Sequence, residues 1–374
     1  SALADAKAWS FVAAEPSLVL PGRTNADWEA LSREVARRQN DDPACGIPLG
    51  FAAGWADYDG TFRFGFYDRL LAYEHAGSRW FSVGGAHCAW AEALAAPPGG
   101  PGRFGPLRFE PSMERADYLA RVARAQEYIA AGDIYQVNLA HRFAAPWTGG
   151  ESFAFYRALR RASPAPHGAF LSLGGREVLS SSPELFLKID GLHIVTRPIK
   201  GTRPRGRDAA GDERNARELA ASRKEQAELI MITDLERNDL GRVCEFHSVR
   251  AREVLKLERF AQVFHLVSTV EGRLRGEVDP VTALRECFPG GSITGAPKKR
   301  AMEIIAELEP VPRGLFTGAI GYFGFNGCSQ FNIAIRTVIV ENHEAQFHVG
   351  AGIVADSQPA AEWDETLHKA AGIL

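Results

Sequence analysis

Two segments of the sequence carry pairs of glutamates three residues apart. Glu225 and Glu228 lie in RKEQAELIMITDL, and Glu362 and Glu365 lie in AAEWDETLHKAAGI. Residues at i and i+3 share a helix face, so each pair directs two carboxylates the same way. Four carboxylates between two facing helices would suit a hard divalent cation such as Mg²⁺, which prefers oxygen ligands. The alternative is that each pair is simply exposed to solvent.

A lysine and a glutamate elsewhere are candidates for covalent and acid–base chemistry. Lys200 lies in TRPIKGTRPRG, close in sequence to four arginines; cations lower the pKa of a lysine, and only the neutral amine is a nucleophile. Glu184 follows a proline in the apolar segment SSSPELF, where burial would raise its pKa and suit a general acid. Lys369 follows Glu365 by four residues and is placed to meet a substrate carboxylate. A surface position is the alternative for Lys200.

Two glycine-rich segments superficially resemble nucleotide-binding loops. PGGSITGAPKK has Ala296 where a P-loop requires lysine. VGAGIVADS has the spacing of a dinucleotide motif, but only residues 356–374 follow it, too few for a βαβ unit. We therefore expect no nucleotide fold. Backbone N–H groups of both segments, beside helix N-termini, suit a carboxylate instead.

The surrounding pattern indicates an α+β fold with mainly antiparallel sheet, because consecutive strand-like segments outnumber helices. Asp59-Gly60 predicts a hairpin, and we expect helices over about 112–131 and 216–235, from Pro297 and from about Gln358. The stretch from 96 to 106 is dense in proline and glycine. We place a boundary there, between a β-rich N-terminal subdomain (1–106) and a main catalytic region (107–374) of one compact fold.

Composition narrows the possible partners and location. The net charge is −3 and no basic cluster stands out, so we expect no nucleic-acid partner. No apolar run approaches the roughly 20 residues of a membrane helix, and the first residues lack the pattern of a signal peptide. The five cysteines are scattered, which favours buried free thiols in a cytoplasmic protein.

Taken together, the motifs resemble those of the chorismate-utilising enzymes, a family that includes anthranilate, aminodeoxychorismate, isochorismate and salicylate synthases. The resemblance covers about residues 112–374 and rests on DIYQVNLA, SSSPELF, RPIKGT, AELIMITDLERNDLGRVCE, FHLVSTVEG, FPGGSITGAPKKRAMEII, GAIGYFG, FNIAIRT and VGAGIVADSQPAAEWDETLHKA. It implies two antiparallel sheets packed as a sandwich with helices outside.

Two positions favour one member of the family. Lys200 in PIKGT resembles aminodeoxychorismate synthase, whereas anthranilate synthases read PIAGT. Gln136 in YQVN stands where isochorismate and salicylate synthases carry a lysine base. We therefore expect 4-amino-4-deoxychorismate synthesis from chorismate and ammonia through a covalent Lys200 intermediate; anthranilate synthase component I and isochorismate synthase are the alternatives. No glutaminase signature is present, so ammonia would come from solution or from a glutamine amidotransferase subunit.

The resemblance also implies a role for each site residue. The four glutamates would hold Mg²⁺, which in turn holds the ring carboxylate of chorismate. Arg336 and the amide of Gly352 would bind the enolpyruvyl carboxylate. Thr202 would join Lys200, Glu184 and His265 as a catalytic residue, and the remaining substrate contacts are Gln136, Gly201, Ser292, Phe316 and Lys369. Phe316 stands where anthranilate synthase has a tyrosine. His265 matches a histidine that anthranilate synthase uses in pyruvate loss. An LLES-like tryptophan-binding segment is not apparent, so tryptophan inhibition is not expected.

Overall fold

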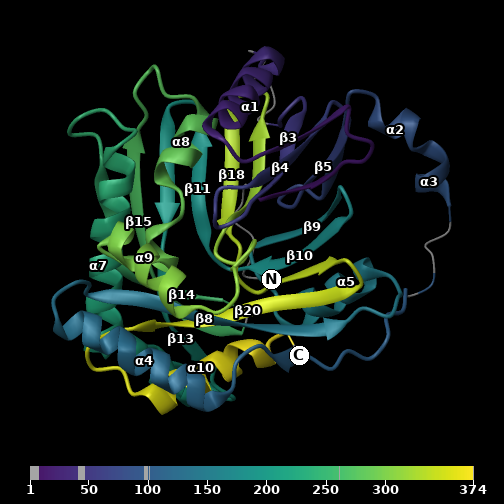
Figure 1. Cartoon of the computed structure of the whole chain (residues 1–374). Helices are drawn as coiled ribbons and strands as arrows, with labels where there is room; N and C mark the ends of the chain where they lie inside the picture. The colour runs from purple at the N-terminus through teal and green to yellow at the C-terminus, as the bar shows by residue number, and fades with distance from the viewer. Residues whose placement is uncertain (1–7, 41–46, 97–99, 101, 261, 374) are drawn as a thin grey trace.

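The structure is a computed structural model that describes residues 8–40, 47–96, 100, 102–260 and 262–373. Within these residues the strands form two large sheets and one small sheet, and the paired strands run antiparallel. Helices lie outside the sheets (Figure 1). The predicted α+β class with antiparallel sheets is confirmed.

The larger sheet has ten strands and combines both parts of the sequence. Its strands, in spatial order, are β13 (Ile199–Pro204), β15 (Val263–Arg273), β12 (His193–Arg197), β11 (Leu185–Asp190), β18 (Cys328–Ile333), β17 (Ala319–Gly324), β3 (Phe51–Ala56), β4 (Phe62–Tyr67) and β2 (Leu18–Gly22), with β14 (Arg250–Arg259) paired to β15. The predicted hairpin joins β3 to β4, and Gly60 takes the positive φ (84°) that its turn requires.

The second sheet has seven strands. They are, in order, β16 (Gly295–Ala296), β8 (Gln136–Pro146), β20 (Glu344–Ile353), β19 (Thr337–Glu341), β10 (Arg176–Ser182) and β9 (His167–Leu173), with β7 (Glu110–Pro111) paired to β8. The long β8–β20 pair lies between β16 and β19 and aligns Asn138 with Gly352.

The N-terminal residues do not form a separate layer. β1 (Trp9–Val12), β5 (Leu70–Glu74) and β6 (Arg79–Val83) make the small sheet. However, β3 pairs directly with β17 of the C-terminal half. The boundary at residue 106 stays a prediction, and part of the stretch that motivated it lies outside the described residues.

Most of the helices pack on the sheets, whereas α2 and α3 lie at the edge of the molecule (Figure 1). The helices are α1 (Asn25–Arg38), α2 (Ala86–Ala89), α3 (Ala91–Ala95), α4 (Arg115–Ala130), α5 (Ser152–Ala162), α6 (Ala209–Ala221), α7 (Arg223–Gly241), α8 (Pro280–Cys287), α9 (Lys298–Leu308) and α10 (Pro359–Ala371). Figure 1 shows α4 beside α10 next to β8 and β20, and α7 lies along β13 and β15. None of these helices has the length and apolar character needed to cross a membrane.

Alternation along β8 and β20 separates an apolar face from a polar one. Val137 and Leu139 of β8, with Ala351 and Ile353 of β20, are buried in the core that α4 and α9 complete. Side chains alternate across a strand, so Gln136, Asn138 and the glycines of β20 occupy the opposite face. Apolar burial against the helices therefore fixes which side chains face the interior between the sheets.

Some local predictions need correction. The helix expected over 216–235 is two helices, because Ser222 ends α6 and caps α7 by accepting a hydrogen bond from the Glu225 amide. Cys244 and Cys287 are buried free thiols as expected, but the free thiol of Cys88 is exposed. Cys45 lies outside the described residues.

Candidate active site

Lys200 and Glu184 meet at one backbone segment between α8 and α9. The Lys200 ammonium donates a hydrogen bond to the Ser292 carbonyl oxygen at 3.2 Å. Glu184 is buried, and the nearby Ser292 side chain and Ile199 backbone amide stabilise its charged form. Burial raises the pKa of Glu184, although Ser292 and Lys200 oppose the shift. The structure thus brings together the predicted acid, the predicted lysine and Ser292.

Two members of the polar face of β8 and β20 border Lys200. A Cβ atom added to Gly352 would lie 2.3 Å from Gln136 Nε2 and 3.8 Å from Lys200 Nζ. A side chain at position 352 would therefore displace the Gln136 amide. The Gln136 Oε1 atom is buried and has no hydrogen-bond partner among the described residues. Gln136 and Gly352 consequently line the same space as Lys200.

The arginines expected to surround Lys200 are paired elsewhere. Arg197 pairs with Glu258, Arg203 with Glu218 and Arg205 with Asp212. The charges that act on Lys200 are instead those of the carboxylates Glu184, Glu228 and Glu365. The electrostatic surroundings of Lys200 are therefore anionic, contrary to the argument from neighbouring cations.

The glutamates of α7 and α10 face each other across a lysine. The Lys224 ammonium lies 4.0 Å from a Glu228 oxygen and 3.8 Å from a Glu362 oxygen. Burial raises the pKa of both glutamates, and the neighbouring Glu365 carboxylate adds to each shift. Lys224 was not predicted as a site residue, although its i+4 spacing to Glu228 was a usable signal.

The four glutamates have the type of ligand atom that a divalent cation requires. Their oxygens are the hard ligands that Mg²⁺ prefers, and the Lys224 ammonium already lies between Glu228 and Glu362. However, no three acidic, histidine or cysteine side chains in the described parts of the chain converge closely enough to ligate one metal. Glu225 approaches Gly201 and Arg203, and Glu365 pairs with Lys369 at 2.7 Å. The four-glutamate Mg²⁺ site therefore stays a proposal.

His265 lies on β15 opposite Thr202 of β13. Its Nδ1 atom is 3.1 Å from the Thr202 hydroxyl and 3.2 Å from the Gly201 carbonyl oxygen. A carbonyl only accepts, so Nδ1 carries the proton and Nε2 is left as an acceptor. Burial lowers the pKa of His265 to about 4, so the ring is neutral near pH 7.

Arg336 is a largely buried cation without an anionic partner. It follows β18 in a left-handed conformation (φ 50°), and its charge acts on the His265 ring. Burial lowers the pKa of its guanidinium, yet no carboxylate within the described residues lies within 4.0 Å of it. A buried guanidinium fork without a counter-ion is suited to a bidentate ligand carboxylate.

Two other predicted substrate contacts have partners within the protein. The Lys369 ammonium donates to the Gly350 carbonyl oxygen at 2.7 Å as well as pairing with Glu365. Phe316 stacks on His348 at 5.3 Å, so its ring packs against β20. Neither arrangement by itself indicates a substrate contact, and both roles stay predictions.

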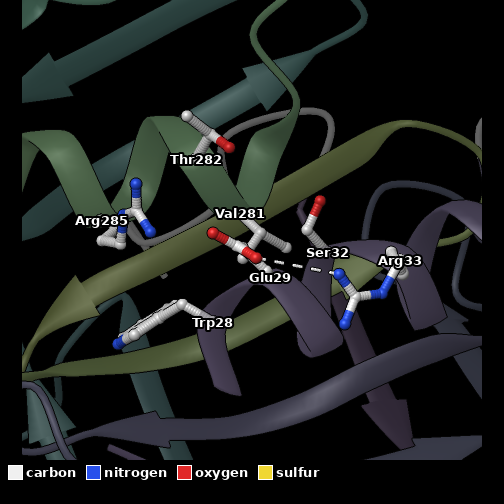
Figure 2. A pocket seen from close by; sticks show the side chains of 7 residues that line it. All are labelled: Trp28, Glu29, Ser32, Arg33, Val281, Thr282 and Arg285. Atoms are coloured by element: carbon white, nitrogen blue, oxygen red, sulfur yellow. Dashed lines mark ion pairs between the residues drawn. The ribbon is translucent and has the colours of Figure 1, made fainter. Parts of the chain in front are cut away.

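A separate pocket of about 190 Å³ lies between α1 and α8. Figure 2 shows its lining, in which Glu29 forms an ion pair with Arg33 and lies between Arg33 and Arg285. None of the predicted site residues lines it. This pocket is therefore separate from the predicted site of Lys200, Glu184, His265 and Arg336.

Comparisons with known proteins agree on one family. Residues 28–374 match the family described as chorismate binding enzyme. Anthranilate synthase component 1 of Streptomyces coelicolor is 49% identical over 275 residues, 73% of this chain and 54% of that protein. Its counterpart in Thermus thermophilus is 47% identical over 293 residues, 77% of this chain and 63% of that protein. The chain thus spans little more than half the length of the curated relatives it matches.

A solved structure gives the same result for the fold. Anthranilate synthase component I from Streptococcus pneumoniae superposes with a TM-score of 0.87 at 29% identity, covering 99% of this chain and 92% of that one. The sandwich-like fold expected from the resemblance is therefore confirmed.

The expectation of aminodeoxychorismate synthase is wrong. The similar proteins, at 45–49% identity, are named anthranilate synthase component 1, which was the stated alternative. That expectation depended mainly on Lys200, a single side chain that the structure places among carboxylates. An identity of 49% over 275 residues is stronger evidence for the family member than the residue at one position. Both the family match and the identity of these relatives place the chain in the family of chorismate-binding enzymes.

Proposed function

We propose that the chain acts as an anthranilate synthase component 1, converting chorismate and ammonia to anthranilate, pyruvate and water. The names of its relatives support this activity. The observation that carries the proposal is Arg336, a largely buried guanidinium with no carboxylate within 4.0 Å among the described residues, whose charge acts on the neutral His265. These two residues would supply a carboxylate-binding cation and a base, which a reaction on an anionic ring substrate requires.

Chorismate would be held through its two carboxylates. Arg336, with the Gly352 amide, would bind the enolpyruvyl carboxylate. Glu225, Glu228, Glu362 and Glu365 would hold Mg²⁺, whose charge, when bound, would neutralise the ring carboxylate and withdraw electrons from the adjacent double bond. Gln136 and Ser292 border the space between these two anchors. The ring would then lie against Lys200 and Glu184.

Glu184 is suited to act as the general acid of amination. Ammonia attacks ring carbon 2, the two ring double bonds shift to carbons 1–6 and 4–5, and the bond from carbon 4 to its hydroxyl breaks. Glu184 supplies the proton with which that hydroxyl leaves as water. The new ammonium group then releases a proton to solvent. Because burial raises its pKa, Glu184 retains this proton at a higher pH than an exposed glutamate does.

His265 is suited to the second half of the reaction. The Nδ1–H group is directed to the Gly201 carbonyl, so Nε2 is free to accept a proton. Removal of the carbon 2 proton breaks the bond between carbon 3 and the enolpyruvyl oxygen. The ring becomes aromatic, and the released enolpyruvate takes up a proton to form pyruvate.

Ammonia would come from a glutamine amidotransferase subunit or from solution. A cytoplasmic location stays a prediction from composition. Neither partner nor location affects the test of the activity, because ammonium salts can replace a partner.

The test follows pyruvate release from chorismate with ammonium and Mg²⁺. We expect release that depends on ammonium, and we expect Arg336→Gln to raise KM for chorismate by about tenfold or more, the usual effect of losing a charge-assisted hydrogen bond. Arg33→Gln, which removes an exposed arginine of α1, is the matched control and should leave KM unchanged. Pyruvate release that is absent, or that proceeds equally without ammonium, would exclude this function.

A further inference from the structure

The second half of α7 carries two more acidic residues, Glu236 and Asp239, on the same side as Glu225 and Glu228. Positions 225, 228, 232, 236 and 239 are three or four residues apart and therefore share one helix face. Glu236 and Asp239 are each only 2% exposed. A buried carboxyl is costly unless hydrogen-bonded, so their contacts reveal their role.

Glu236 binds the backbone of the segment that contains Ser292. Its Oε1 atom accepts hydrogen bonds from the amides of Gly291 at 3.0 Å and Ser292 at 3.3 Å. The Thr196 hydroxyl lies 3.3 Å from Oε2. Gly291 permits this close approach, because a Cβ atom there would lie 2.7 Å from Leu235 and 3.2 Å from Glu236 Oε1.

Asp239 and Lys298 fasten both ends of the same segment to α7. The Lys298 ammonium lies 2.6 Å from Asp239 Oδ2 and also donates to the carbonyl oxygens of Cys287 and Pro289, at 3.1 and 2.8 Å. Lys298 is itself the first residue of α9. Residues 287–298 are therefore held at their beginning, middle and end by one helix.

This segment determines where two predicted active-site groups lie. The Ser292 carbonyl oxygen accepts a hydrogen bond from Lys200, and the Ser292 side chain lies close enough to Glu184 to lower its pKa against the effect of burial. A displacement of Ser292 would shift both contacts at once. Shifts of about 1 Å in such groups can cost on the order of a hundredfold in rate.

We propose that Glu236 is a positioning residue, which holds the Gly291 and Ser292 amides so that Ser292 keeps Glu184 and Lys200 in place for the amination step. This inference rests on the proposed function. It adds a link from the helix of Glu225 and Glu228 to the predicted general acid, and it involves no contact between Glu236 and substrate.

The charges around Glu236 favour its neutral form. Burial and the neighbouring Asp239 raise its pKa to about 8, with Glu184 adding to the rise and Lys298 opposing it. At pH 7 a glutamine should therefore be a close substitute, because it keeps an oxygen acceptor for both amides. An alanine removes the acceptor, and an aspartate keeps the acid but withdraws it from the amides.

The experiment compares Glu236→Ala, Glu236→Asp and Glu236→Gln with wild type in the anthranilate assay and by hydrogen exchange of the peptide spanning residues 288–296. We expect Glu236→Ala to lower kcat at least tenfold while KM for chorismate changes less than threefold, and to speed exchange of the Gly291 and Ser292 amides. Glu236→Asp should show the same effects if Glu236→Ala does not fold. Glu236→Gln should stay within threefold of wild type in kcat.

Asp57→Asn is the matched control, since Asp57 is a buried carboxyl bound to Arg176 outside the site. It should lower the melting temperature without changing kcat. The proposal is overturned if kcat of both shortened variants stays within twofold of wild type, if exchange of residues 288–296 is unchanged, or if Asp57→Asn loses as much activity. If the wild type consumes no chorismate, the proposed function fails, and the exchange comparison alone then decides whether Glu236 holds the segment.

Discussion

At the scale of single residues, the charges around Lys200 explain why the presence of a lysine favoured the wrong member of the family. A lysine beside four arginines in the sequence suggested a neutral amine. However, three of these arginines form ion pairs with acidic residues: Arg197 with Glu258, Arg203 with Glu218 and Arg205 with Asp212. Lys200 instead faces Glu184, Glu228 and Glu365. We therefore expect it to act as a fixed positive charge beside the acid of the reaction.

This role predicts a shift in the pH profile of the Lys200→Ala variant. Burial raises the pKa of Glu184 and Lys200 opposes that rise, so removing the lysine should raise the pKa further. A general acid works only while protonated, and activity falls as pH rises through its pKa. The alkaline limb of the kcat profile should therefore move to higher pH in Lys200→Ala.

The control for this prediction is Lys188→Ala, which removes an exposed lysine of β11 and should leave the profile unchanged. An alkaline limb that stays in place, or that moves to lower pH, would show that Lys200 does not tune the acid. Complete loss of activity at every pH would equally contradict a purely electrostatic role.

At the scale of elements, breaks in regular structure direct the site residues. Ser222 separates α6 from α7 and places Glu225 in the first turn of α7. Pro198 separates β12 from β13, and Arg336 separates β18 from β19 with a positive φ. Each break lies at or near a predicted site residue. The regular elements therefore fix the backbone on either side, and the breaks determine the direction of the site side chains.

The facing glutamates of α7 and α10 give the prediction at this scale. Glu228→Gln removes one anionic oxygen ligand, so the affinity for Mg²⁺ should fall by about tenfold or more. Loss of a residue that only hydrogen-bonds to a metal ligand already has an effect of about this size. Direct metal titration by calorimetry, together with the Mg²⁺ dependence of pyruvate release, measures the change.

Glu303→Gln is the matched control on α9, because Glu303 is an exposed glutamate paired with Arg300. It should leave the Mg²⁺ affinity unchanged. Equal metal affinity of wild type and Glu228→Gln would mean that Glu228 is not a ligand and that Lys224 satisfies these carboxylates permanently.

At the scale of the whole molecule, the sequence predicted the class of the fold, whereas the roles of the site residues stay predictions. Short-range patterns sufficed for the β3–β4 hairpin and for the acidic helix faces, because helix and strand periodicity is local. They did not reveal the pairing of β3 with β17 or the fastening of residues 287–298 to α7, which join distant segments. Glu236 and Asp239 continued the face of Glu225 and Glu228, and that spacing was the signal available.

The choice between family members shows the same limit. One side chain at position 200 favoured the wrong product, since its chemistry depends on which charges the fold brings near it. Comparison of the sequence and the fold along most of the chain corrected this prediction, because it does not depend on a single position. The identity of the product is therefore the property that tests the proposed function most directly.

The most direct measurement is the mass of the product formed from chorismate and ¹⁵N-ammonium by the purified chain with Mg²⁺. The account predicts ¹⁵N-labelled 2-aminobenzoate, accompanied by one pyruvate for each labelled ring. A labelled product that retains the enolpyruvyl group and carries nitrogen at carbon 4, or an unlabelled isomer of chorismate, would contradict it.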